Sequence, residues 1–230
     1  MIRQLQFVHI GKCGGSTVNS LLRQSPLISQ RYSSFFESHI NGVNPDLGCD
    51  YLFCIRNPID RAFSGFEWRR KLILIDQIPG QVCRFPGEAE VLSRYGSLGE
   101  IARRLYRASD GRLDQAVARD YGLIHHLRES IAFYLEPLLN GVVCPENVFG
   151  VVCQEFLQED CLRILGVAPG ELRERSNDSR RSIEHDLDAV AVKNLRRFLV
   201  KDYQCLTALW SLGCLSDRRY WNLMRFSDEI

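Results

Sequence analysis

The chain has 230 residues, of which 45% are hydrophobic and 25% charged, as is usual for a globular protein. This length is enough for one well-buried domain, and a second full domain is not expected. The formal net charge is only +1, so the composition does not indicate a nucleic-acid-binding protein. Any site for an anion must therefore come from the local placement of lysine and arginine residues.

The cysteine pattern and the apolar runs indicate a compartment. The sequence has nine cysteines, an odd number, and no C-x-x-C pair, so neither a zinc site nor a disulfide framework is indicated. Cys54 and Cys153 stand inside apolar runs, which is typical of buried free thiols. No apolar run approaches the length of a membrane span, and the few residues before the first expected strand leave no room for a signal peptide. We therefore expect a cytoplasmic protein with no membrane partner.

A glycine-rich stretch near the N-terminus has the pattern of an anion-binding turn. Apolar residues 5–10 predict a short buried strand, and a helix is expected to open at Gly15 or Ser16. Glycines between them let consecutive N–H groups face a phosphate, and the helix N-terminus adds its partial positive charge. Lys12 precedes Gly14, whereas the lysine of the common nucleotide P-loop directly follows the last glycine. The cradle therefore resembles a P-loop, but its lysine lies on the N-terminal side of the glycines.

The next segment of the chain brings an acid and an imidazole to one strand. Residues 31–40 are expected to be extended and to stop at turn signals. Side chains alternate between the two faces of a strand, so Glu37 and His39 point the same way. These two residues are candidates for acid–base chemistry.

A second strand and helix place an arginine near the cradle. Residues 51–55 form a continuous apolar run, as in a central parallel strand, and Arg56 follows at its carboxyl end. Pro58 suits the first position of the next helix, and Ser64 then lies about two turns along it. Ligands of open α/β sheets bind beyond the carboxyl ends of the strands, so we expect Arg56 on the same rim as Lys12.

The rest of the chain predicts mostly helices. We expect helices near 97–106, 123–139, 154–165 and 187–212, a strand at 148–153, and loops at 78–87 and 171–181. The charge run 69–71 is typical of a solvated helix end, and His125 and His126 are interpreted as structural or surface residues. The arginine-rich loop 171–181 is either plain surface or a clamp for a second phosphate through Arg180 or Arg181.

Two motifs resemble those of sulfotransferases that use 3′-phosphoadenosine 5′-phosphosulfate (PAPS). Residues 9–17, H-I-G-K-C-G-G-S-T, resemble the 5′-phosphosulfate loop of that family, usually written H-I-P-K-T-G-G-T-T. Residues 55–66, I-R-N-P-I-D-R-A-F-S-G-F, resemble its 3′-phosphate motif, R-[DN]-P-x-x-R-x-x-S. Each motif alone is moderately specific, and the two together in this order and spacing are a strong signal.

The resemblance extends to a third stretch. Residues 35–40, F-F-E-S-H-I, are similar to the F-Y-H-G-H-V stretch of uronyl 2-O-sulfotransferases of the carbohydrate branch. The similarity is close over residues 7–66 and looser over 133–165. Gly11 stands where the family has proline, Cys13 where it has threonine, and Glu37 where it has the first histidine. A reactive Cys13 thiolate is a minor alternative, since no His–Asp pair completes an acyl-transfer site.

The resemblance implies a fold and a set of roles. It implies a single α/β domain over 1–230, with a central parallel sheet flanked by helices as in P-loop nucleotide hydrolases. Within this domain it implies a phosphosulfate loop at 7–18, a 3′-phosphate motif at 55–66 and an acceptor region at about 70–140. The nucleotide-binding residues would be Gly11, Lys12, Cys13, Gly14, Gly15, Ser16, Thr17, Arg56 and Ser64, with Arg180 or Arg181 closing over the 3′-phosphate. Lys12 would stabilise the leaving phosphate, with His39 as the base. Glu37 would orient His39 or act as the base itself.

The expected activity is transfer of the sulfuryl group of PAPS to a hydroxyl or amine of a carbohydrate or small molecule, with PAP (3′-phosphoadenosine 5′-phosphate) as product. No metal is required for this chemistry. One alternative is an atypical P-loop kinase or ATPase. Two features count against it: Lys12 precedes the glycines, and no strand clearly ends in an acidic residue. The other is a nucleotide-binding module without turnover. The sequence indicates neither the acceptor nor the oligomeric state.

Overall fold

The structure is a computed structural model that describes residues 4–39, 42–43, 45–46, 48–167 and 186–225. The described residues belong to two compact units. The first, here called the sheet unit, comprises Met1–Asn57, Ile131–Glu174 and Asp202–Met224. The second, the helical unit, comprises Pro58–Ser130, Arg175–Lys201 and Arg225–Ile230. The single-domain organisation expected from the sequence stays a prediction.

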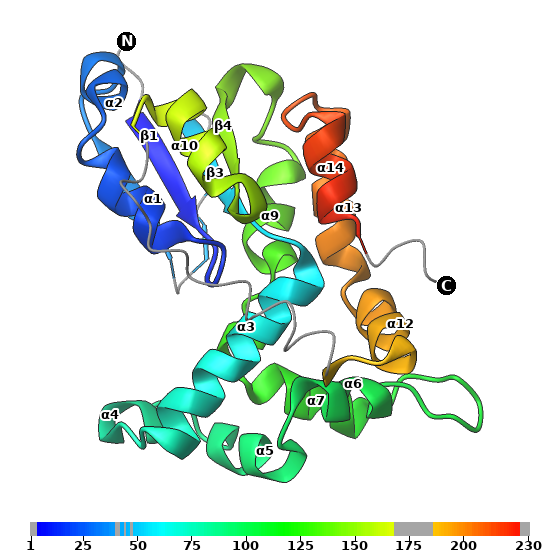
Figure 1. Cartoon of the computed structure of the whole chain (residues 1–230). Helices are drawn as coiled ribbons and strands as arrows, with labels where there is room; N and C mark the ends of the chain where they lie inside the picture. Colours follow the sequence, from blue (N-terminus) through cyan, green and yellow to red (C-terminus); the bar gives the residue numbers. More distant parts are fainter. Residues whose placement is uncertain (1–3, 40–41, 44, 47, 168–185, 226–230) are drawn as a thin grey trace. The chain divides into compact units, whose positions relative to one another are not determined.

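In the described part of the sheet unit, four parallel strands form one sheet in the order β2-β1-β3-β4 (Figure 1). They are β1 (Gln4–His9), β2 (Phe35–Ser38), β3 (Cys49–Ile55) and β4 (Val148–Cys153). Every residue of β3 is buried, as expected for a central strand covered on both faces. The predicted α/β class, with a parallel sheet flanked by helices, is confirmed.

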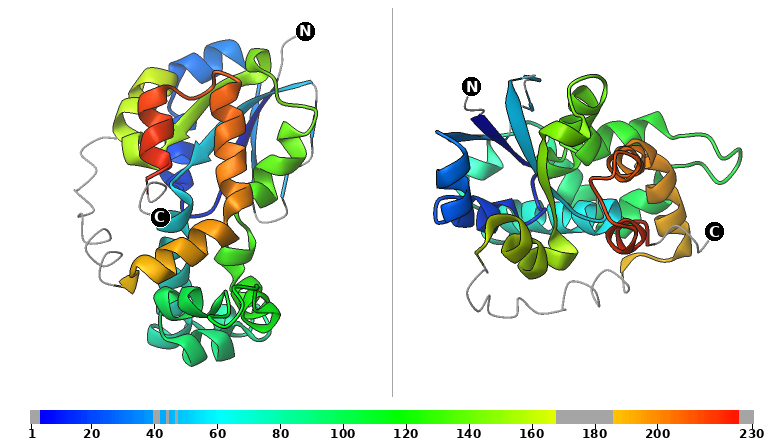
Figure 2. Two further views of the ribbon diagram at one scale, coloured as in Figure 1. Left: turned by 90° about the vertical axis from the view of Figure 1, so that its right-hand side faces the viewer. Right: turned by 90° about the horizontal axis from the view of Figure 1, so that it is seen from above.

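Helices cover both faces of this sheet. Figures 1 and 2 show α1 (Gly15–Leu22) and α10 (Leu157–Leu165) on one face, together with α2 (Pro26–Arg31), and α9 (Ile131–Leu139) on the other. The unit also contains α14 (Asp217–Leu223), most of α13 (Val200–Ser211), and the short 3₁₀ turns η2 (Pro145–Asn147) and η3 (Gln154–Phe156). Fully buried side chains such as Phe7, Phe53 and Leu165 fill the core. Each contributes about 1.5–3 kcal/mol through the removal of apolar surface from water.

The helical unit is built around α3 (Pro58–Arg70), which begins at the predicted proline. A π-helical turn, η1 (Lys71–Ile75), continues it. Its other elements, among the described residues, are α4 (Pro79–Val82), α5 (Glu88–Tyr95), α6 (Leu98–Arg104), α7 (Gln115–Leu123), α8 (His125–Arg128) and α12 (Ala189–Phe198). The loop expected at 78–87 thus contains one helical turn.

A buried ion pair holds the helical unit together. The Arg69 guanidinium donates two hydrogen bonds to the Glu88 carboxylate, at 2.9 and 2.7 Å, and both side chains are almost fully buried. Glu88 also accepts a hydrogen bond from the backbone N–H of His125 at 2.9 Å. The expectation of a solvated charge run is therefore wrong for Arg69. Removing one partner of such a pair typically costs about 3–5 kcal/mol, because the other charge is left buried.

The helix expected over 123–139 is broken in two. Arg61, in α3, donates hydrogen bonds to the carbonyl oxygens of His126, within α8, and of Glu129, the residue that caps its C-terminus. His125 is buried, lies 3.0 Å from the Glu129 carboxylate and stacks on Phe85, as expected for a structural histidine. The break follows from a tertiary contact that helical periodicity does not reveal.

Candidate functional site

The predicted strand, turn and helix of the cradle are present. β1 ends at His9, the turn closes with a 3.3 Å hydrogen bond from the N–H of Cys13 to the carbonyl oxygen of Ile10, and α1 begins at Gly15. Gly14 caps the helix with a left-handed φ of 83° and supplies no capping side chain. In the first turn of α1 the N–H of Thr17 donates to the carbonyl oxygen of Gly14 at 3.1 Å, and the N–H groups of Gly15 and Ser16 precede any helical carbonyl, so this end can receive an anion.

Lys12 occupies an unusual backbone conformation in this turn. Its φ is 70°, in the left-handed region, which costs a non-glycine residue about 1–2 kcal/mol. Strain of this kind persists where the surrounding structure enforces it, and it is frequent at ligand sites. Gly11 has no positive φ, so a left-handed backbone does not explain the presence of glycine at this position.

Cys13 points into the protein. Its side chain is fully buried, and its carbonyl oxygen accepts a hydrogen bond from the Cys54 thiol at 2.5 Å. Burial raises the pKa of Cys54, and that of Cys153, well above the usual value. Buried free thiols are thus confirmed for these residues, and the burial of Cys13 counts against its minor interpretation as a nucleophile.

Arg56 and the cradle meet at the rim of the sheet. Nη1 of Arg56, directly after β3, lies 3.4 Å from the carbonyl oxygen of Lys12 and donates to it. The turn after β3 is fixed by Glu155, whose carboxylate accepts from the N–H of Asn57 at 2.8 Å. The prediction that Arg56 shares a rim with Lys12 is confirmed.

Three other predicted residues are not among the described residues of the sheet unit. Ser64 is half-buried on α3 and belongs to the helical unit. Arg180 and Arg181, with the rest of 171–181, lie outside the described residues. The site that can be built from the sheet unit therefore consists of the cradle, Arg56 and the residues at the end of β2.

Glu37 is held by two neighbours. One carboxylate oxygen accepts a hydrogen bond from Nδ1 of His9, and the other accepts one from Nδ2 of Asn19, on α1. His9 was not a predicted site residue. The parallel register, which pairs Phe7 with Glu37 and Val8 with Ser38, brings the end of β1 beside the end of β2. Only that strand pairing shows that His9 contacts Glu37.

His39 is fixed by the same residue. Its Nδ1 lies 2.8 Å from the carbonyl oxygen of His9, and because a carbonyl can only accept, Nδ1 carries the proton. The two imidazoles stack, with centroids 4.2 Å apart and planes 14° apart. In neutral His39, Nε2 is then the nitrogen that can accept a proton. Glu37 and His39 therefore both contact His9, Glu37 through the Nδ1 of its ring and His39 through its carbonyl oxygen and its ring face.

His9 is also confined on the side of the cradle. A Cβ atom placed on Gly15 would lie 1.9 Å from Cδ2 and 2.3 Å from Nε2 of His9, so only glycine leaves room for the ring. Burial lowers the pKa of His9 below its usual 6.5, and nearby His39 lowers it further, whereas Glu37 acts in the opposite direction. Neutral His9 is therefore the form that the fold favours.

The stability of the protein should depend on pH through His9. Because folding lowers its pKa, the unfolded chain binds more protons below about pH 7, and the free energy of unfolding should fall as the pH decreases through that range. Urea denaturation at several pH values between 5 and 8 measures this, and the His9→Gln variant should show a weaker dependence. The same pH dependence in both proteins would contradict the assignment.

Comparison with protein-family models, with curated proteins and with solved structures finds no match. Among the residues that the structure describes, no cluster of three or more His, Cys, Asp or Glu side chains has a geometry that could hold a metal ion. Within the same residues, no helix combines the length and apolar character needed to cross a membrane.

Proposed function

We propose that this protein is a sulfotransferase that moves the sulfuryl group of PAPS to a hydroxyl or amine of a carbohydrate or small-molecule acceptor. One observation carries the proposal: the Nδ1–H of His39 donates to the carbonyl oxygen of His9, two residues before the anion cradle, so Nε2 is the nitrogen of His39 that could act as a base. Sulfuryl transfer needs a base at the acceptor and a cation at the leaving phosphate. His39 and Lys12 supply this pair.

The donor nucleotide would be held by the cradle and by Arg56. The N–H groups of residues 14–16 and the hydroxyls of Ser16 and Thr17 suit the 5′-phosphate, at the positive end of α1. Arg56, bonded to the Lys12 carbonyl, suits the 3′-phosphate. The roles of Ser64, Arg180 and Arg181 stay predictions from the sequence.

The proposed reaction is an in-line displacement. His39 Nε2 takes the proton of the acceptor as the acceptor oxygen or nitrogen forms its bond to sulfur. The bond from sulfur to the phosphate oxygen breaks, and Lys12 stabilises the charge that grows on that oxygen. His9 and Glu37 hold the base in place and do not exchange the proton. PAP and the sulfated acceptor leave.

Nucleotide binding tests the proposal first. Isothermal titration should show that PAP binds more tightly than AMP, which lacks the 3′-phosphate, and that Arg56→Ala reduces this preference by about 10- to 100-fold, the effect of one or two charge-assisted hydrogen bonds. Arg31→Ala is the matched control, because Arg31 is an exposed arginine on α2 of the same unit. Its preference for PAP should equal that of the wild type.

Two results would decide against a sulfotransferase. Equal affinity for PAP and AMP in the wild type would remove the basis for a 3′-phosphate site. Stabilisation by ATP with Mg²⁺ and not by PAP would favour the kinase or ATPase alternative. If PAP binds selectively, a turnover assay with labelled PAPS and a panel of acceptors separates the enzyme from an inactive nucleotide-binding module.

A further inference from the structure

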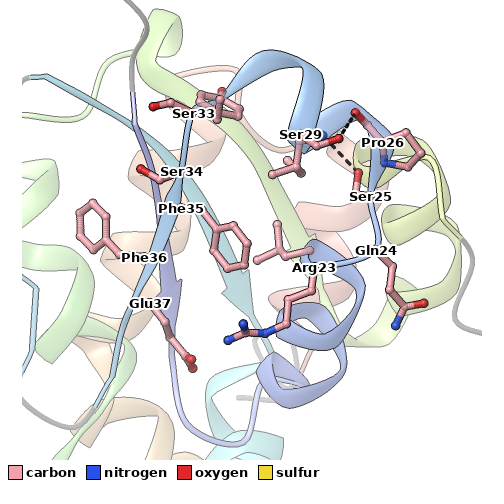
Figure 3. Close-up of a pocket in the computed structure, with 13 residues that line it drawn as sticks. Arg23, Gln24, Ser25, Pro26, Ser29, Ser33, Ser34, Phe35, Phe36 and Glu37 are labelled. Carbon is pink, nitrogen blue, oxygen red and sulfur yellow. Dashed lines mark hydrogen bonds between the residues drawn. The ribbon is translucent and has the colours of Figure 1, made fainter.

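A groove opens on the sheet unit between the edge strand β2 and the helices α1 and α2. Its volume is about 770 Å³, within the range of about 300–1,000 Å³ that is usual for small-molecule sites. Figure 3 shows the side chains of Arg23, Phe35 and Glu37 turned toward the same space, while Phe36 points away from it. Glu37 is the residue whose carboxylate holds His9, so one end of the groove reaches the candidate site.

Arg23 gives the groove a positively charged wall. It is the C-cap residue that follows α1, and its guanidinium carbon lies 5.8 Å from the centre of the Phe35 ring. This cation–π contact holds the guanidinium beside the ring, and its N–H donors can reach an anion in the open groove. Arg23 and Phe35 together suit a flat ring that bears a negative charge.

The position of the groove is the one that an acceptor needs. The cradle follows β1, Arg56 follows β3, and Glu37 lies on β2, on the other side of β1. If the nucleotide extends from the cradle toward Arg56, the side of β2 remains for the acceptor. In-line transfer requires the acceptor to approach opposite the leaving group. This step rests on the proposed function.

The charges set the orientation of the bound molecule. The Glu37 carboxylate disfavours a second anion directly beside it, while Arg23 attracts one over the Phe35 ring (Figure 3). A hydroxyl group therefore suits the end near Glu37 and His39. We propose that the groove binds the acceptor, and that Arg23 makes the site specific for small aromatic carboxylates that also carry a hydroxyl group.

Binding of two matched probes to the full chain tests this proposal without the donor. 4-Hydroxybenzoate carries the carboxylate, and 4-hydroxybenzyl alcohol is its neutral counterpart. Titration followed by NMR or calorimetry should show at least about tenfold tighter binding of the benzoate, the effect of one charge-assisted hydrogen bond. The Arg23→Gln variant should lose this difference, and Arg23→Lys, which keeps the charge, should retain part of it.

The control is Arg31→Gln, because Arg31 makes comparable cation–π contacts, with Tyr32 and Phe149, and does not line the groove. It should preserve the preference for the benzoate. Equal binding of the two probes, no binding of either, or an unchanged preference in Arg23→Gln with wild-type thermal stability would each overturn the proposal.

The outcomes separate this proposal from the proposed function. Selective PAP binding without Arg23-dependent probe binding would refute the groove as the acceptor site and leave the sulfotransferase proposal standing. Arg23-dependent probe binding without PAP binding would refute the sulfotransferase and leave a binding site for aromatic carboxylates.

Discussion

Replacing His39 with alanine should lower kcat by about 10²–10⁴-fold, the usual contribution of a general base, and leave the affinity for PAP nearly unchanged. The reason is geometric. The proton on Nδ1 is held by the carbonyl oxygen of His9, so the lone pair of Nε2 is the group that can accept the acceptor's proton. Steady-state kinetics with labelled PAPS and calorimetry with PAP give the two quantities.

Two further variants make this result specific. His126→Ala removes a half-buried histidine of the helical unit and should have kcat close to the wild type. Glu37→Gln keeps a hydrogen-bonding group beside His9 and should reduce kcat less than His39→Ala does. A larger loss in Glu37→Gln than in His39→Ala would assign the base to Glu37, and wild-type kcat in His39→Ala would exclude His39 from that role.

Replacing Gly15 with alanine should damage the site without touching a polar group. The added Cβ would lie 1.9 Å from Cδ2 of His9, so the imidazole must move away from Glu37 and from its stack with His39. Overpacking of this kind costs about 1–3 kcal/mol, which should be visible as a lower midpoint in urea. Turnover should fall with it, because the base loses its support.

Gly122→Ala is the matched control. Gly122 lies in α7, and a Cβ there would meet nothing within 4 Å. Alanine should be neutral or stabilising by up to about 1 kcal/mol at this helical position. In the double variant His9→Ala/Gly15→Ala, the clash is removed, so the two stability losses should not add. Strict additivity would show that the methyl group does not act through His9.

Local sequence predicted the elements that depend on neighbouring residues. Chain reversal at Gly14, the start of α3 at Pro58 and the burial of β3 follow from glycine conformation, proline geometry and an apolar run, each of which acts over a few residues. The rim shared by Lys12 and Arg56 was also predictable, because parallel strands end at one edge of their sheet.

The contacts that organise the candidate site are long-range. His9 and Glu37 are 28 positions apart, and they meet because β1 pairs with β2 in one register. In the helical unit, Arg69 pairs with Glu88 in the interior, and the helix expected over 123–139 is interrupted where Arg61 donates to the carbonyl oxygens of His126 and Glu129. Neither periodicity nor charge pattern contains these pairings.

The sequence by itself thus determined the α/β class, the cradle with Lys12 and the position of Arg56 after a buried strand, because these depend on local backbone preferences and on the common direction of parallel strands. The tertiary structure alone decided that Glu37 holds His9, that His9 fixes the free nitrogen of His39, and that a groove with Arg23 leads to this cluster. Strand register and side-chain packing determine these features, and both arise only when distant segments meet.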